Sequence, residues 1–179
     1  MMAFAYRLHD LHERFFGAFR TVLGGSLLQL LARLTLAGVF WRSLLTKVET
    51  AKLFTYTEYI NDFPVERARM RVPELPLELK PATLHQFSND FVLPLIPGDI
   101  AAWMATLGEF VLPILLVLGL FTRFAAMGLL VMTVVIQLFV FPEAWWGTHA
   151  LWAVMAIFIA AYGPGRLSLD HVFGNRFAR

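Results

Sequence analysis

Five polar side chains interrupt segments of the chain that are otherwise almost wholly apolar. They are Arg33, Lys47, Glu109, Gln137 and His149. An ionised side chain near the centre of a membrane-spanning helix costs about 2.5–3.5 kcal/mol on insertion scales, so such a residue faces a partner or a cavity rather than lipid. A carboxylate, two cations, an amide and an imidazole can together hold a proton or hydrogen-bond a polar ligand. Their types and positions predict a buried polar cluster or ligand-binding site.

Arg33 and Glu109 lie deepest within the apolar segments. From the outer ends of the helices that we expect to carry them, at about 1.5 Å per residue, Glu109 is roughly 15 Å deep and Arg33 roughly 20 Å deep. The arginine side chain is long enough to close that gap, so we expect a buried Arg33–Glu109 ion pair. Such a pair either fixes the register of two helices or orients a carboxylate that faces a ligand or carries a proton.

The other three polar residues are expected near one end of the helices. Lys47 ends the first apolar segment, Gln137 lies inside the third, and His149 opens the fourth. His149 has the chemistry of a proton carrier, a metal ligand or a hydrogen-bond donor to a ligand, and the alternative is a polar anchor at a membrane surface. We expect Gln137 to hydrogen-bond between helices.

The composition restricts the function classes. Apolar residues make up 58% and charged residues 16%, against about 45–50% and 25% in soluble domains. The chain has no cysteine, which excludes disulfides, a thiol nucleophile and a thiolate-ligated cluster. No metal, phosphate-loop or dinucleotide motif is present, so we expect no metal site. The net charge of +2 gives no reason to expect a nucleic-acid partner. Nothing in these patterns identifies an enzyme.

The elements that position the polar residues follow from the hydropathy. Charged residues gather in the first 20 residues, in the segment from 47 to 99 and after residue 165, with long apolar stretches between them. A transmembrane helix needs about 20 mostly apolar residues. We predict four spans, at residues 27–45, 100–120, 124–141 and 148–163. The predicted fold class is therefore all-α, an integral membrane four-helix bundle forming a single domain over residues 1–179.

The segments outside the spans complete this prediction. Residues 1–22 have an aromatic apolar face, which favours an amphipathic helix lying at the membrane interface over one packed on the bundle. Residues 46–98 form a long loop or cap with short helices expected at Leu53–Ile60 and Leu84–Leu93, and residues 164–179 form a tail. Two short turns and one long connection place both termini on one side, and the positive-inside rule favours the cytoplasmic side, N-in and C-in.

Several short motifs together carry a family resemblance. The first span and the two residues after it contain Arg33 to Lys47 (RLTLAGVFWRSLLTK), the second span contains Gly108-Glu109, and His149 opens the fourth. The turn LGLFTR ends in Arg123, and the closing motif GPGRLSLD supplies Gly163, Pro164, Gly165, Ser168 and Asp170. Over about residues 30–172 this combination resembles the DoxX family, and Arg123 with the closing motif is expected to have a structural role.

The resemblance implies a multi-pass protein of the bacterial inner membrane with four helices. Namesake relatives are linked to a thiosulfate:quinone oxidoreductase, and others form oxidoreductase assemblies with soluble partners. The long loop followed by Phe91–Ala102 resembles a proteobacterial branch that is often encoded beside multinuclear non-haem iron oxidases, in systems tied to copper or other metal stress.

Three functional hypotheses follow from the resemblance and the polar residues together. The leading one is an accessory membrane subunit, not an enzyme on its own, that supports a redox or metal-stress pathway by holding a quinone or lipid-like molecule. Arg33, Lys47, Glu109 and His149 would line its interior. The alternatives are a quinone-reactive oxidoreductase subunit and a small transporter or channel. The expected partners are the lipid bilayer, a soluble or membrane oxidoreductase, and a second copy of the chain.

Overall fold

Four helices of the computed structural model are long and apolar enough to cross a membrane, as the hydropathy predicted. The structure describes residues 12–13, 16–17 and 26–177, so the predicted amphipathic helix at residues 1–22 lies almost wholly outside the described residues. The spans are α2 (Leu28–Lys47), α4 (Gly98–Leu118), α5 (Thr122–Phe139) and the segment Pro142–Tyr162. That last segment joins η2 (Pro142–Ala144), η3 (Trp145–His149) and α6 (Ala150–Tyr162).

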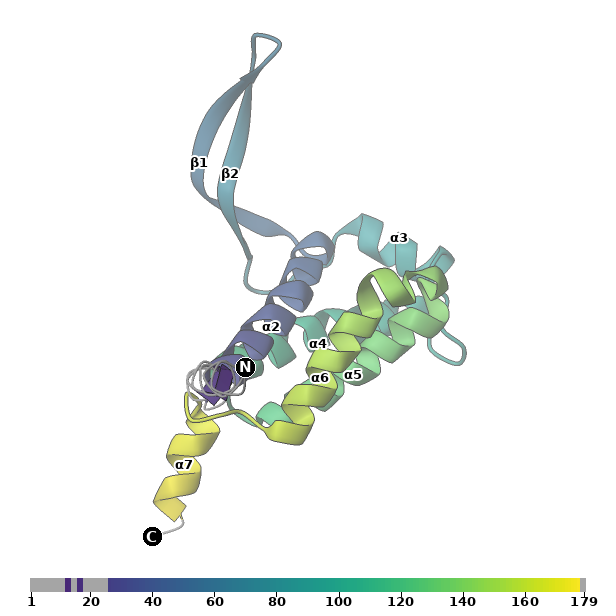
Figure 1. The fold of residues 1–179 in the computed structure, drawn as a ribbon. Coiled ribbons are helices and arrows are strands. Elements are labelled where there is room, and N and C mark those ends of the chain that lie inside the picture. Colours follow the sequence, from purple (N-terminus) through teal and green to yellow (C-terminus); the bar gives the residue numbers. More distant parts are fainter. Residues whose placement is uncertain (1–11, 14–15, 18–25, 178–179) are drawn as a thin grey trace, which may run out of the picture.

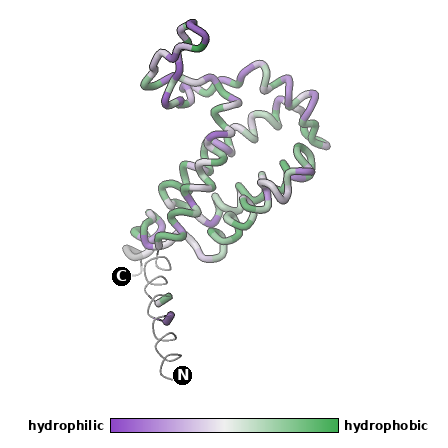
Figure 2. The backbone as a smooth tube through the Cα atoms, turned by 45° about the horizontal axis from the view of Figure 1, so that its top comes forward, coloured by the Kyte–Doolittle hydropathy of each residue, from purple (hydrophilic) through white to green (hydrophobic). Residues whose placement is uncertain are grey.

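The four long helices share one apolar core. Its buried side chains come from all four of them: Leu36, Ala37, Phe40, Leu116, Ala125, Ala126, Leu129, Ala156 and Ile159. Figure 2 shows mainly apolar residues along these helices and more hydrophilic residues in the segment between α2 and α4. Glycines bring α4 and α5 close together, because a Cβ at Gly108 would lie 2.9 Å from the Met132 sulfur and one at Gly128 only 2.8 Å from Leu112. Small residues allow such close helix packing in membranes.

A β-hairpin follows α2, so the all-α prediction is wrong in this segment. Strands β1 (Thr50–Ile60) and β2 (Phe63–Pro73) pair antiparallel, and the predicted helix at Leu53–Ile60 is instead strand β1. The segment is rich in Thr, Tyr, Phe and Val, which favour strands. Between the strands, Asn61 and Asp62 have φ values of 49° and 62°, the left-handed conformation of a two-residue hairpin turn. Figure 1 shows the hairpin projecting from the end of the helices opposite to α7 (Leu169–Phe177).

A short helix, α3 (Pro81–Asn89), packs across the ends of the long helices. It overlaps the helix expected at Leu84–Leu93 but begins three residues earlier, where Pro81 occupies the first turn, a position that suits proline. Backbone hydrogen bonds join Lys80 to Lys47 and Glu49 to Glu78, which holds α3 beside the end of α2. Phe87 of α3 packs on Ala101 and Ala102 of α4. The chain between α3 and α4 then folds back over the same end.

The closing motif holds the opposite end of the helices together. Asp170 accepts hydrogen bonds from the backbone N–H groups of Phe121 and Thr122, both at 2.9 Å, and so caps the start of α5. Its own N–H donates to the Gly119 carbonyl at 2.9 Å. Gly163 and Gly165 have positive φ values of 79° and 77°, which glycine adopts without the steric penalty of a Cβ.

We expect Asp170→Ala to destabilise the protein by about 1–2 kcal/mol, because two N–H groups at the start of α5 would lose their acceptor. Thermal unfolding in detergent measures the change. Asp99→Ala is the matched control, since Asp99 lies in the first turn of α4 but no side chain caps that helix. Equal losses in the two variants would contradict a specific capping role for Asp170.

Candidate functional site

Arg33 is fully buried and belongs to the closing-motif end of the helices. Its guanidinium donates to four backbone carbonyls, Leu116 O at 2.7 Å, Val117 O at 2.9 Å, Pro164 O at 2.9 Å and Leu167 O at 2.8 Å. It therefore ties the C-terminal end of α4 and the turn after α6 to α2. The expected Arg33–Glu109 ion pair is wrong, because the donors of Arg33 are directed to these carbonyls and Glu109 has another partner.

That partner is Lys47. Its ammonium contacts both oxygens of the Glu109 carboxylate at 2.9 Å and donates to the Ser43 hydroxyl at 2.8 Å. Ser43 in turn donates to Glu109 Oε1 at 2.9 Å. The side chain of Glu109 is 2% exposed and that of Lys47 is 15% exposed. A carboxylate that is removed from solvent to this extent is stabilised only by paired charge and hydrogen bonds, and here α2 supplies both.

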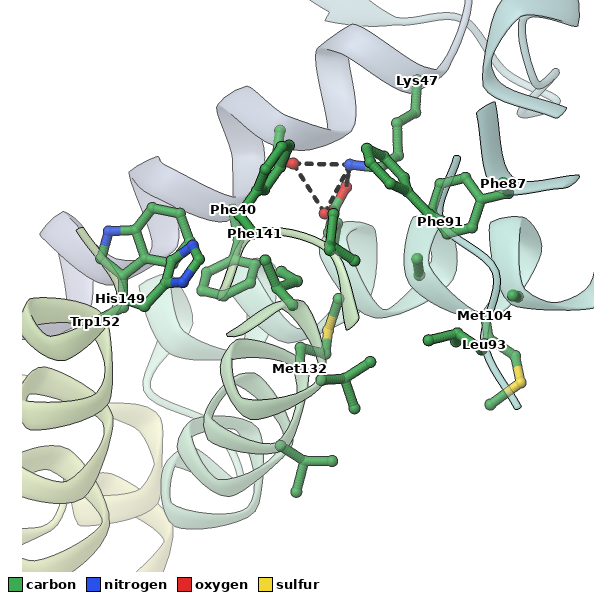
Figure 3. Close-up of a pocket in the computed structure, with 18 of the residues that line it drawn as sticks. Phe40, Lys47, Phe87, Phe91, Leu93, Met104, Met132, Phe141, His149 and Trp152 are labelled. Carbon is green, nitrogen blue, oxygen red and sulfur yellow. Dashed lines mark hydrogen bonds and ion pairs between the residues drawn. The ribbon is translucent and has the colours of Figure 1, made fainter. Parts of the chain in front are cut away.

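The Lys47–Glu109 pair borders a cavity of about 320 Å³, within the size range of ligand pockets. Side chains from α2, α3, α4, α5, α6 and the chain before α4 line it, and all but four of the lining residues are apolar. Figure 3 shows Lys47 on one side of the cavity, His149 and Trp152 on another, and Phe87, Phe91 and Leu93 toward α3. The aromatic rings of Phe40, Phe91, Phe141 and Trp152 provide flat apolar walls.

His149 forms the second polar contact of this cavity. Its Nδ1 lies 2.7 Å from Gln137 Oε1, while the Gln137 amide nitrogen donates to Pro142 O at 2.5 Å. This second bond orients the amide so that its oxygen, which can only accept, faces the histidine. Nδ1 therefore carries the proton, and in the neutral ring Nε2 keeps its lone pair. Within the described part of the chain no donor bonds to Nε2. The ring also packs on Trp152, with centroids 5.0 Å apart.

The structure thus brings together four of the five polar residues singled out by sequence, Lys47, Glu109, Gln137 and His149, and places Arg33 elsewhere. Sequence reasoning missed Ser43, although it lies four residues before Lys47 and so on the same helix face. The aromatic walls were also missed, because aromatic residues occur throughout the apolar segments and carry no positional signal.

The residues of the structural motif gather at the Arg33 end. Ser168 Oγ donates to Gly165 O at 2.7 Å and accepts from the His171 N–H at 3.1 Å. A Cβ at Gly163 would lie 3.3 Å from the guanidinium of Arg123, so these two residues are close neighbours. None of the motif residues lines the cavity. The motif and Arg33 therefore lie at one end of the helices, and the cavity lies toward the other end.

The chain has four apolar helices around a shared core and an ion pair buried beside an internal cavity. These features are those of a multi-pass membrane protein. The family model of DoxX matches residues 28–142, more than half of the chain, and the chain belongs to the DoxX family. No curated protein and no solved structure matched it. The match contains Arg33, Lys47, Glu109, Arg123 and Gln137 but ends before His149.

Proposed function

We propose that this protein is a membrane subunit that binds one amphipathic molecule through a hydroxylated, hydroquinone-like head group. The observation that carries the proposal is the cavity of about 320 Å³ with apolar walls and two hydrogen-bond acceptors. Pockets of this kind bind small molecules through apolar contact and are oriented by a few polar groups.

The hydrogen bonds of the site favour a ligand that donates rather than one that accepts. The Lys47 ammonium has three N–H donors, and its contacts with Ser43 and the two Glu109 oxygens account for them. The Ser43 hydroxyl proton is also used, because it bonds to Glu109. What stays available is acceptor capacity, on Glu109 Oε2 and on His149 Nε2. A hydroquinone has two hydroxyl groups that can donate to acceptors of this kind, whereas a quinone has only carbonyl oxygens, which accept.

The wider role is also a proposal. The bundle would lie in the bacterial inner membrane with both termini inside, and the β-hairpin and α3 outside. In that setting the protein would act as an accessory subunit of a redox or metal-stress pathway. It would hold and orient the ligand while a partner oxidoreductase carries out electron transfer. The support for this role is the family resemblance, together with a site that is built for binding.

A quinone-reactive oxidoreductase subunit is the second candidate. The observation that favours it is that Glu109 and His149, two groups able to accept protons, both border the cavity. Oxidation of a hydroquinone releases two protons and two electrons, so such a subunit also needs an electron acceptor. Incubation of the purified protein with hydroquinone and a soluble acceptor separates the two candidates. Turnover supports the oxidoreductase, and binding without turnover supports the accessory subunit.

Binding itself is tested with a decyl-substituted hydroquinone under anaerobic conditions. The protein in detergent should retain this probe and should not retain its dimethyl ether, which has the same ring and alkyl chain but a methyl group in place of each hydroxyl proton. Mass spectrometry of the washed protein measures both. Equal retention of hydroquinone and ether would contradict the hydroxyl-specific site.

We expect the double variant His149→Phe/Gln137→Leu to bind the hydroquinone about tenfold more weakly, because one hydrogen bond worth about 1–1.5 kcal/mol is lost. Changing both residues removes the His149–Gln137 bond without leaving either partner unsatisfied. Pro142 O also loses its donor, but this contact is exposed and water can replace it, so the fold should be retained. His85→Phe is the control, since His85 is exposed on α3 and does not line the cavity. Unchanged affinity in the double variant would exclude His149 from the binding site.

A further inference from the structure

The cavity is not equally closed on all sides. Toward α3 aromatic rings narrow it, since Phe87 and Phe91 pack edge to face with centroids 5.6 Å apart, and Phe91 and Phe141 do so at 5.5 Å. Of these three rings, Phe141 is 45% exposed. Phe87 and Ala101, which line this side, are buried. A ligand approaching along the helix axes from the α3 end therefore meets three packed rings.

Between α4 and α5, two residues that line the cavity are exposed. Met104 and Val131 both line the cavity, yet each is 59% exposed on the outer surface of the helices. A side chain that faces a cavity and the outside at once marks the edge of an opening. Val135 lines the same edge one helical turn from Val131.

The glycines of α4 and α5 mark where the two helices come closest. Close approach occurs where Gly108 meets Met132 and where Gly128 meets Leu112. Met104 lies one turn from Gly108, on the α3 side of that contact. Val131 directly precedes Met132, so Met104 and Val131 both border this close contact, and both line the cavity while being exposed. The neighbours on the outer surface, including Leu107, Val134 and Leu138, are apolar and exposed, as expected of residues that contact lipid.

From this geometry we infer that the cavity is entered sideways from the lipid, through a portal between α4 and α5 edged by Met104 and Val131. The inference rests on the proposed ligand-binding function and adds a class of ligand to it. The ligand is a molecule dissolved in the bilayer, whose head group reaches Glu109 and His149 while its alkyl chain stays in the portal among the lipid chains. A water-soluble ligand without such a chain has no comparable route.

The absence of cysteine from the natural sequence permits a reversible test. In Val131→Cys the new thiol is the sole site for a bulky methanethiosulfonate reagent, and a reductant removes the label again. The protein is reconstituted in phospholipid vesicles and loaded with deuterated decyl hydroquinone. Exchange against unlabelled decyl hydroquinone is then followed by mass spectrometry. Met104→Cys is treated in the same way, and Val134→Cys, exposed on α5 but outside the cavity lining, is the matched control.

Labelling Val131→Cys or Met104→Cys should slow exchange by about tenfold, change the equilibrium occupancy much less, and be reversed by the reductant. Labelling Val134→Cys should leave the rate unchanged. Exchange at the unlabelled rate in both portal variants, or equal slowing in the Val134→Cys control, would overturn the portal. Failure of the unlabelled variants to bind the probe at all is a different result, because it contradicts the proposed function and the portal together.

Discussion

Replacement of Arg33 by methionine is expected to destabilise the protein by at least about 3 kcal/mol, since each buried carbonyl left without a donor costs about 1–3 kcal/mol. Four carbonyls from two segments, the end of α4 and the turn from Pro164 to Leu167, accept from this one guanidinium. Leu116 O also accepts from the Gly119 N–H at 3.2 Å, and among the described residues the other three have no second donor. Helix C-terminal carbonyls have no partner within their own helix, and the negative end of the helix dipole adds to the attraction of the cation. Methionine has a similar length but no donor. Thermal unfolding in detergent measures the loss.

Two further variants separate this role from the general effect of removing a charge. Arg42→Met, on the exposed side of the same helix, should change stability little. Arg33→Lys should recover only part of the loss, because an ammonium has three donors and lacks the planar fork that reaches several carbonyls. Full recovery with lysine would show that charge alone matters. A stable Arg33→Met protein would contradict the structural role.

The location of Arg33 shows where sequence reasoning reached its limit. The length and hydropathy of each span follow from local composition, and the structure has four helices long and apolar enough to cross a membrane. The offset between neighbouring helices does not follow from composition. The expected depths of Arg33 and Glu109 assume that the ends of neighbouring spans lie at the same level. In the structure α4 begins beyond the end of α2, and the first turns of α4 pack on α3. This offset brings Glu109 level with Lys47 and Ser43 instead of Arg33.

The hairpin was missed for a different reason. Short apolar runs such as Leu53–Ile60 fit a helix or a strand about equally well by periodicity alone. The turn at Asn61 and Asp62 was the better signal, because both residue types tolerate the left-handed conformation that a two-residue hairpin turn requires. Phe54, with φ of 53°, interrupts the pairing between Leu53↔Met70 and Thr55↔Ala68, and the register is the same on both sides of it.

The sequence indicates candidate site residues where chemistry restricts position. Charged and amide side chains in apolar helices must find partners, which marked Lys47, Glu109, Gln137 and His149 in advance. The cavity between them depends on how Phe40, Phe91, Phe141 and Trp152 pack, and packing of this kind is decided by tertiary contacts. The polar residues of the site can therefore be predicted from the sequence, but the apolar residues that line the cavity cannot.

Loss of one member of the Lys47–Glu109 pair should cost more stability than loss of both. Lys47→Met leaves the carboxylate of Glu109 buried without its cation. We expect a loss of about 2–3 kcal/mol, below the range for fully buried pairs because Lys47 is partly exposed. The double variant Lys47→Met/Glu109→Met replaces the pair by apolar side chains and should regain most of this stability. Thermal unfolding of the wild type, both single variants and the double variant gives the coupling energy as a double-mutant cycle.

The same double variant separates stability from function. If the pair serves only to hold α2 against α4, the double variant should bind decyl hydroquinone as the wild type does. If Glu109 Oε2 accepts a hydrogen bond from the ligand, the double variant should fold normally but bind decyl hydroquinone at least about tenfold more weakly. This is the loss expected for a hydrogen bond to a charged group. Retention of the probe, measured at equal folded concentration, decides between them. We expect the second result, because Glu109 lines the cavity and Ser43 bonds to Oε1, which leaves acceptor capacity on Oε2.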